Sequence, residues 1–213
     1  MKRRTGWVPQ CQKPRGPLGR FVLWTMNSSH SRLTDWGLSH VFIGNRYTIL
    51  DVGCGGGRTV NKLAALASEG RVYGADYSAE SVSFARKKNY RSIRCGRVEI
   101  QEASVSQLPF PDNMFDVVTA VETHFWWSDV HAGMREILRV LKPGGTLVIV
   151  AEIYKQANSR KSEFLEKHIS LSGMKLLTID EHRELFATAG YSDIQVAAEP
   201  SKTWICCTGR KPM

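Results

Sequence analysis

The chain has 213 residues, of which 42% are hydrophobic and 23% charged, and it is expected to form a globular protein with one sizeable core. No apolar run is long enough to cross a bilayer, and the basic N-terminus lacks the apolar segment and cleavage site of a secretory signal. The five cysteines form no C-x-x-C pair and are odd in number, which indicates neither a disulfide framework nor a zinc site: Cys11, Cys54, Cys95, Cys206 and Cys207. We therefore expect reduced thiols and a cytoplasmic protein.

The formal net charge of +9 is concentrated near the N-terminus, because residues 1–34 hold seven basic residues and no acidic one. A basic tail can contact nucleic acid or an anionic surface, although a solvated extension that only aids solubility accounts for it equally well. Proline and glycine predict that residues 1–19 are an irregular tail. Residues 20–213 are expected to form a single domain.

Along that domain, short apolar strands alternate with helices, which is typical of βαβ units and a mostly parallel sheet. Residues 20–45 are expected to form a helical cover, and residues 154–175 a substrate lid with a helical apolar face. The expected strands are 48–52, 72–75, 98–101, 115–121, 146–151, 194–198 and 203–208, and the expected helices are 58–66, 79–89, 129–141 and 178–190. The last two strands have no helix between them and predict an antiparallel hairpin. The pattern indicates an α/β, Rossmann-like, mostly parallel seven-stranded sheet with helices on both faces and an antiparallel C-terminal strand.

The most informative stretch is ILDVGCGGGRTV at residues 49–60. The first strand brings Asp51 to its carboxyl end, where open α/β sheets bind their ligands. The glycines that follow make a tight turn and let a ligand approach the backbone closely. An acid just before the glycines is unsuited to a pyrophosphate but suits a cationic ligand, and no P-loop pattern is present.

The segment Asp51–Gly57 resembles the D-x-G-x-G-x-G signature of class I S-adenosylmethionine-dependent methyltransferases. Three later stretches agree with that family in order and spacing: VYGADYS, SQLPFPDNMFDVV and EILRVLKPGGTLVIV. The resemblance runs from about Leu33 to the C-terminus and is greatest to the small-molecule group that includes the ubiquinone and menaquinone methylases. It implies S-adenosylmethionine (SAM) as cofactor, S-adenosylhomocysteine (SAH) as product, a small-molecule acceptor and no metal.

The resemblance also implies roles for individual residues. Asp76 is expected to bind both ribose hydroxyls, and it lies 19 residues after Gly57, near the interval at which an acid meets a ribose. Alternatively, Asp76 only caps the helix that starts at Ser78. Asp51 is expected near the methionine amino group, or it binds amides of its own loop. Three loop residues complete this end of the cofactor site: Gly53, Cys54 and Gly55.

At the adenine end, the family usually has an acid followed by a small apolar residue, and the corresponding positions here are Ser104 and Val105. This chain therefore has a serine where the family has an acid. The Ser104 hydroxyl is expected to bind the adenine amine, and the Val105 N–H to bind adenine N1. Tyr77 is expected either to pack on the adenine face or to be a surface aromatic residue.

Candidates for catalysis follow the fourth strand. Glu122 is expected to bind the cofactor or assist the transfer, and His124 is the candidate base near neutral pH, unless its role is structural. Trp126 and Trp127 are expected to close over an apolar substrate or the sulfonium, or to pack beneath the N-terminal arm. His30 is a second histidine candidate.

Other functions remain open at this point. An RNA or protein methyltransferase is supported by the basic tail, but the Asn/Asp-Pro-Pro-Tyr/Phe motif of amine methylases is absent where ETHFWW stands. A non-catalytic SAM-binding module is the next alternative, and a dehydrogenase is disfavoured by the acid ahead of the glycines. The sequence identifies neither the acceptor nor its reacting atom.

Overall fold

The protein is described by a computed structural model in which residues 16, 31–155, 174–199 and 201–213 are placed well enough to describe. In that part of the chain, seven strands form one sheet in the order β3-β2-β1-β4-β5-β7-β6. The first five strands are parallel, and β7 is antiparallel to both β5 and β6. The strands are β1 (Thr48–Val52), β2 (Arg71–Asp76), β3 (Val98–Glu102), β4 (Phe115–Val121), β5 (Leu141–Ala151), β6 (Ser192–Glu199) and β7 (Trp204–Arg210). The predicted fold class is confirmed.

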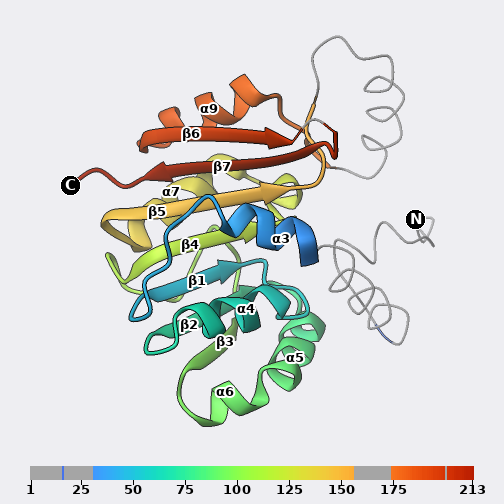
Figure 1. Ribbon diagram of the computed structural model, residues 1–213, viewed down its shortest axis with the longest axis vertical. Coiled ribbons are helices and arrows are strands. Elements are labelled where there is room, and N and C mark those ends of the chain that lie inside the picture. The colour runs from blue at the N-terminus through green and yellow to red at the C-terminus, as the bar shows by residue number, and fades with distance from the viewer. Residues whose placement is uncertain (1–15, 17–30, 156–173, 200) are drawn as a thin grey trace.

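Helices cover both faces of this sheet (Figure 1). They are α3 (Ser31–Leu38), α4 (Arg58–Leu66), α5 (Ala79–Lys88), α6 (Tyr90–Arg94), the 3-10 turn η1 (His124–Trp126), α7 (Val130–Val140) and α9 (Ile179–Thr188). Apolar residues of α3, α4 and α5 share one core with one face of the sheet, while those of α7 and α9 share a second core with the other face. The near-continuous apolar strands follow from burial on both sides.

The last strand illustrates this two-sided burial. Cys206 belongs to the core under α3, and its neighbour Cys207 belongs to the core under α7 and α9, as alternation along a strand requires. Both thiols are free, and burial raises their pKa values, to about 12 for Cys206. Helix α3 approaches β5 closely at Gly37, where any side chain would overlap Val150.

Some elements differ from the prediction in their bounds, and two were not predicted. Strand β5 begins at Leu141 and not at Thr146, because Leu141 pairs with Phe115 before a β-bulge brings Thr146 opposite Val117. Helix α6 and turn η1 were not predicted, since each is too short to show a periodic pattern. The predicted tail apart from Gly16, residues 20–30 of the predicted cover with His30, and residues 156–173 of the predicted lid lie outside the described residues.

Within the described residues, no helix is both long and apolar enough to cross a membrane.

Helix α9 begins with the predicted capping box, in which the Thr178 hydroxyl accepts the Glu181 N–H at 3.1 Å and the Glu181 carboxylate accepts the Thr178 N–H at 2.6 Å. We expect Thr178→Ala to lower the free energy of unfolding by about 1 kcal/mol, because it leaves a helix N–H unpaired. Urea unfolding measures this, with Glu184→Ala on the exposed side of the same helix as control. Equal changes in the two variants would contradict the capping role.

Candidate functional site

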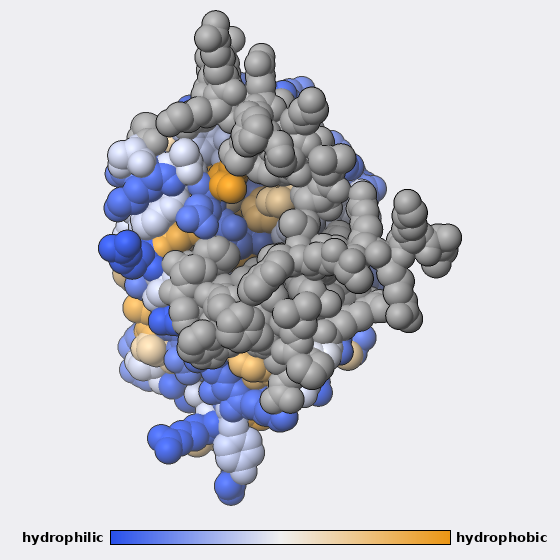
Figure 2. Space-filling view, turned by 90° about the vertical axis from the view of Figure 1, so that its right-hand side faces the viewer, coloured by the Kyte–Doolittle hydropathy of each residue, from blue (hydrophilic) through white to orange (hydrophobic). Residues whose placement is uncertain are grey.

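Three acidic side chains lie at the carboxyl ends of three neighbouring parallel strands. Asp51 stands near the end of β1, Asp76 ends β2, and Glu122 follows β4 directly. Because the strands are parallel and adjacent, the acids share one edge of the sheet. Figure 2 views the molecule from this side, where hydrophobic and hydrophilic residues show between the segments drawn in grey.

Asp76 connects the glycine loop to helix α5. One carboxylate oxygen accepts the Gly55 N–H and the other accepts the Ser78 N–H, each at 2.9 Å. The N-cap of α5 is Ser78, whose hydroxyl accepts the Ser81 N–H, so Asp76 is not the capping side chain. Burial raises the pKa of Asp76, and the two amide bonds partly oppose that shift.

Asp51 is almost completely buried and accepts a hydrogen bond from the Thr119 hydroxyl of β4 at 2.7 Å. The loop amides of Gly53 and Cys54 donate to the Ala75 carbonyl at 2.7 and 3.1 Å, and not to Asp51. Burial raises the pKa of Asp51 to about 7, with the Thr119 bond opposing the shift and the charge of Asp76 adding to it. A cation beside Asp51 would therefore favour its ionised form.

The glycine loop touches the loop that follows β4. Gly53 has a φ of +66°, and a Cβ added there would overlap the Thr123 hydroxyl. The Thr123 hydroxyl in turn accepts the Trp127 indole N–H at 3.3 Å. Both the backbone conformation and the lack of space therefore require glycine at this position.

A cavity of about 290 Å³ opens beside these loops. Its lining comes from the ends of β1, β2, β3 and β4: Val52, Gly53, Ala75, Asp76, Tyr77, Ala103, Ser104, Val105, Thr123, Trp126, Trp127 and Ser128. Five of the predicted cofactor residues line it, namely Gly53, Asp76, Tyr77, Ser104 and Val105. Asp51, Cys54, Gly55, Glu122 and His124 do not belong to the lining. Val52, Ala75, Ala103 and Ser128 were not predicted, because none of them has a distinctive chemistry in the sequence.

Two serine hydroxyls lie together after β3, and one of them, that of Ser104, belongs to the lining of the cavity. The Ser104 and Ser106 hydroxyl oxygens are 2.9 Å apart, and the Ser104 oxygen also lies 3.3 Å from the Ser106 amide nitrogen. A hydroxyl both donates and accepts, so Ser104 retains a hydrogen-bonding function for a ligand although the family's acid is absent.

Glu122 has a strained backbone, with a φ of +58°. Its carboxyl group accepts the Glu152 N–H and so connects the ends of β4 and β5. Burial raises the pKa of Glu122 to about 8, and the nearby charge of Glu152 adds to the shift. At pH 7 this group is mostly a neutral carboxylic acid. Strained residues and displaced pKa values of this kind concentrate at functional sites.

His124 lies in η1, where it contacts helix α9. Its Nε2 is 3.2 Å from Nε2 of His182. Burial, with a smaller contribution from His182, lowers the pKa of His124 to about 3. The ring is therefore neutral at physiological pH, and it is a weaker base than the sequence suggested.

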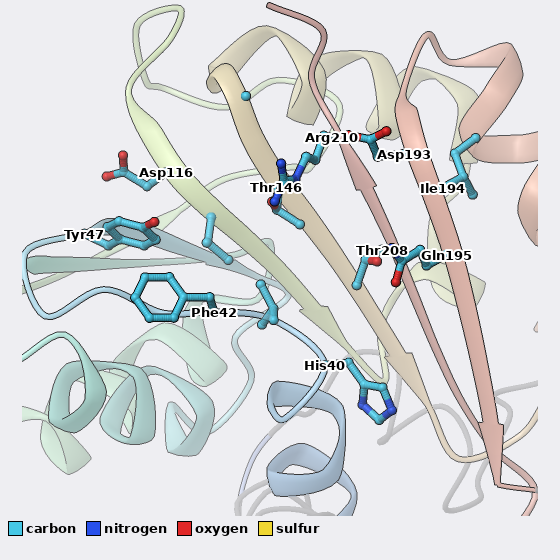
Figure 3. Close-up of a pocket in the computed structure, with 13 residues that line it drawn as sticks. His40, Phe42, Tyr47, Asp116, Thr146, Asp193, Ile194, Gln195, Thr208 and Arg210 are labelled. Atoms are coloured by element: carbon cyan, nitrogen blue, oxygen red, sulfur yellow. The ribbon is translucent and has the colours of Figure 1, made fainter.

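A second cavity, of about 660 Å³, lies near the opposite ends of the central strands (Figure 3). It is lined from the segment before β1 and from β4, β5, β6 and β7, with Phe42 and Tyr47 on one side and Thr208 and Gln195 on the other. Asp116 in this cavity is already paired with Lys142 at 2.7 Å. The cavity does not include the acidic edge, so we base the functional assignment on the smaller one.

Comparisons with known proteins identify the family. Residues 50–149 match a family model described as a methyltransferase domain. The chain is 32% identical over 148 residues to the O-methyltransferase cnsE of Penicillium expansum, covering 70% of this chain and 53% of that protein. It is 35% identical over 148 residues to the ubiquinone/menaquinone biosynthesis C-methyltransferase UbiE of Pseudomonas putida, covering 67% and 56%. The chain carries a class I SAM-dependent methyltransferase domain.

The fold of this methyltransferase domain agrees with a solved structure of a Haloferax volcanii methyltransferase in complex with the Trm112 methyltransferase activator. The TM-score is 0.76 at 24% identity, with 92% of this chain and 95% of the other covered. The chain spans about half the length of the two curated relatives named above.

The residues around the cavity fit SAM, the cofactor of this class of methyltransferase domain. Among the described residues of the lining, Asp76 is the charged one, and Asp51 and Glu122 lie at the same edge of the sheet. A pyrophosphate would need positive charge or free loop amides there. A ribose with an ammonium and a sulfonium group matches the acids instead.

We expect Gly53→Ala to destabilise the protein more than Gly96→Ala, by about 1–3 kcal/mol, because only the former forces overpacking. Gly96 is the matched control, since it has a similar φ of +70° and no atom within 4 Å of an added Cβ. Urea unfolding measures the stability, and calorimetry with SAH measures the site. Equal stability and unchanged SAH affinity would show that the contact of Gly53 with Thr123 does not shape the cavity.

Proposed function

We propose that this protein is a SAM-dependent methyltransferase that transfers a methyl group to a small-molecule acceptor. The cavity at the ends of β1, β2 and β4 carries this proposal, because Asp76 lines it and Asp51 and Glu122 lie at the same edge, which suits a cationic nucleoside ligand. The methyltransferase domain and the small-molecule relatives support it. When bound, SAM supplies an activated methyl group on a sulfonium.

Each end of the cavity holds a different part of that cofactor in the proposal. Asp76 accepts hydrogen bonds from the ribose hydroxyls, and Asp51 offers its charge toward the methionine ammonium. The Gly53 loop provides close backbone approach, with Cys54 and Gly55 supporting it. Ser104, the Val105 N–H and Tyr77 contact the adenine.

The acceptor binds, in this proposal, beyond the walls made by Trp126 and Trp127, which exclude water and favour an apolar or aromatic group. The relatives include O- and C-methyltransferases by their names, so the chemical element that is methylated stays open. We expect no metal and a cytoplasmic location. The basic tail, the feature that supports an RNA acceptor, lies outside the described residues.

Of the two catalytic candidates, neither is a strong base at pH 7. His124 is neutral but has a low pKa, and Glu122 is mostly protonated. We therefore propose that neither acts as a general base, and that catalysis depends mainly on positioning and on exclusion of water.

We expect Asp76→Asn to weaken SAH binding by about 10- to 100-fold, because it replaces charge-assisted bonds to the ribose with weaker ones. The substitution keeps the volume of the side chain. The control is Glu102→Gln, at the exposed end of the neighbouring strand β3 and outside the lining. Titration calorimetry measures the affinity of each variant for SAH. If the wild-type protein gives no heat with SAH at high micromolar concentration, the proposed function itself is overturned.

We expect the affinity for SAH to depend on pH because of Asp51. Its carboxyl has a pKa of about 7 in the free protein, and the ionised form binds the ammonium, so SAH affinity should fall as the pH drops. Between pH 8 and pH 6 we expect a loss of about tenfold. Calorimetry at pH 6, 7 and 8 measures it, and Asp51→Asn should remove the dependence. An equally steep dependence in Asp51→Asn would exclude Asp51 as the titrating group.

A further inference from the structure

Helix α7 contains a buried glycine, Gly133, within its first half. Glycine is among the least favourable residues in a helix interior, because it loses the most backbone freedom on folding. The Gly133 N–H donates to the Asp129 carbonyl at 3.1 Å, as in an ordinary helix, and the φ of Gly133 is not positive. The backbone conformation therefore gives no reason for glycine here, which leaves space as the reason.

The space beside Gly133 is filled by two residues of the cofactor cavity. A Cβ added to Gly133 would lie 2.8 Å from Cε3 and 3.2 Å from Cζ3 of Trp127, and 3.3 Å from Cγ1 of Val105. Both residues line the cavity. Val105 follows β3 and Trp127 follows η1, so they come from different loops. Gly133 is thus the point of α7 at which two walls of the cavity pack against the helix.

The Trp127 ring has little freedom to move aside. Its indole N–H donates to the Thr123 hydroxyl at 3.3 Å, and the side chain belongs to the buried core. The atoms that face Gly133 are part of a rigid fused ring, which cannot bend away as the end of a flexible side chain can. A methyl group on α7 would therefore displace the whole ring. Because the ring also lines the cavity, its displacement away from α7 narrows the cavity.

We propose that Gly133 is a positioning residue for cofactor binding: because it has no side chain, Trp127 and Val105 can pack against α7 and leave the cavity wide enough for an adenine nucleoside. Gly133 lies outside the lining and acts through these two residues. The inference rests on the proposed function, in which Val105 contacts the adenine.

The first test is calorimetry with SAH on Gly133→Ala. We expect SAH binding to weaken by about tenfold, because the added methyl group displaces the Trp127 ring. Gly37→Ala is the matched control, since Gly37 is also a buried helix glycine and an added Cβ there would lie 2.4 Å from Cγ2 of Val150, outside the lining. Urea unfolding of both variants measures their stability, and we expect Gly37→Ala to lose stability without losing affinity for SAH.

Two outcomes of this test would overturn the proposal. One is an affinity of Gly133→Ala within about twofold of the wild-type value. The other is an equal loss of affinity in Gly37→Ala, which would show that overpacking of any helix weakens SAH binding.

A double-mutant cycle tests whether Trp127 transmits the effect. Trp127→Phe removes the fused six-membered ring that carries Cε3 and Cζ3, together with the bond to Thr123. Adding Gly133→Ala to Trp127→Phe should then change the SAH affinity by less than about threefold. A further tenfold loss in the phenylalanine background would exclude Trp127 as the intermediary and overturn the proposal.

The cycle also covers the case in which Gly133→Ala alone does not fold. The double variant must then fold and bind SAH as Trp127→Phe does, and its failure in either respect contradicts the inference. Lack of SAH binding by the wild-type protein would refute the proposed function. Normal binding by the wild-type protein, with no loss in Gly133→Ala, refutes only the role of Gly133.

Discussion

Burial of carboxyl groups at one edge of a parallel sheet is the interaction on which the rest of this molecule depends. Strands β2, β1 and β4 are neighbours, so the acids at their ends converge. Their stabilising partners are neutral: the Thr119 hydroxyl for Asp51, and backbone amides for Asp76 and Glu122. Hydrogen bonds from these neutral donors hold the acids in place but only partly oppose the rise in their pKa values that burial causes. A cationic ligand would favour their ionised forms.

Close contacts hold together the loops at that edge. Gly53 packs against Thr123, and Thr123 accepts the indole N–H of Trp127. Trp127 contributes to both the core and the cavity wall. The paired histidines extend this chain of contacts to α9. The cofactor cavity and the loop after β4 therefore form one packed unit, in which movement of one part would disturb the other.

Much of the fold could be predicted from local patterns, because strands buried on both faces and capped helices have strong signals. The capping box at Thr178 and Glu181 and the hairpin of β6 and β7 were both confirmed. The start of β5 was wrong, because Lys-Pro-Gly-Gly normally marks a turn. Here those residues form a bulge, and pairing of Leu141 with Phe115 extends the strand past them.

For the site, the sequence indicates which residue types take part, but it does not show what surrounds each of them. The motif ILDVGCGGGRTV, with Asp76 at the next strand end, was enough to predict a cationic nucleoside site, because an acid and close-approach glycines occur in a fixed order along the chain. His124 was predicted as a base, since an isolated histidine titrates near neutral pH. Only the tertiary structure shows His182 beside it and water excluded from both rings, which keeps His124 neutral. Burial and partners set a side chain's protonation state, and both come from segments distant in sequence.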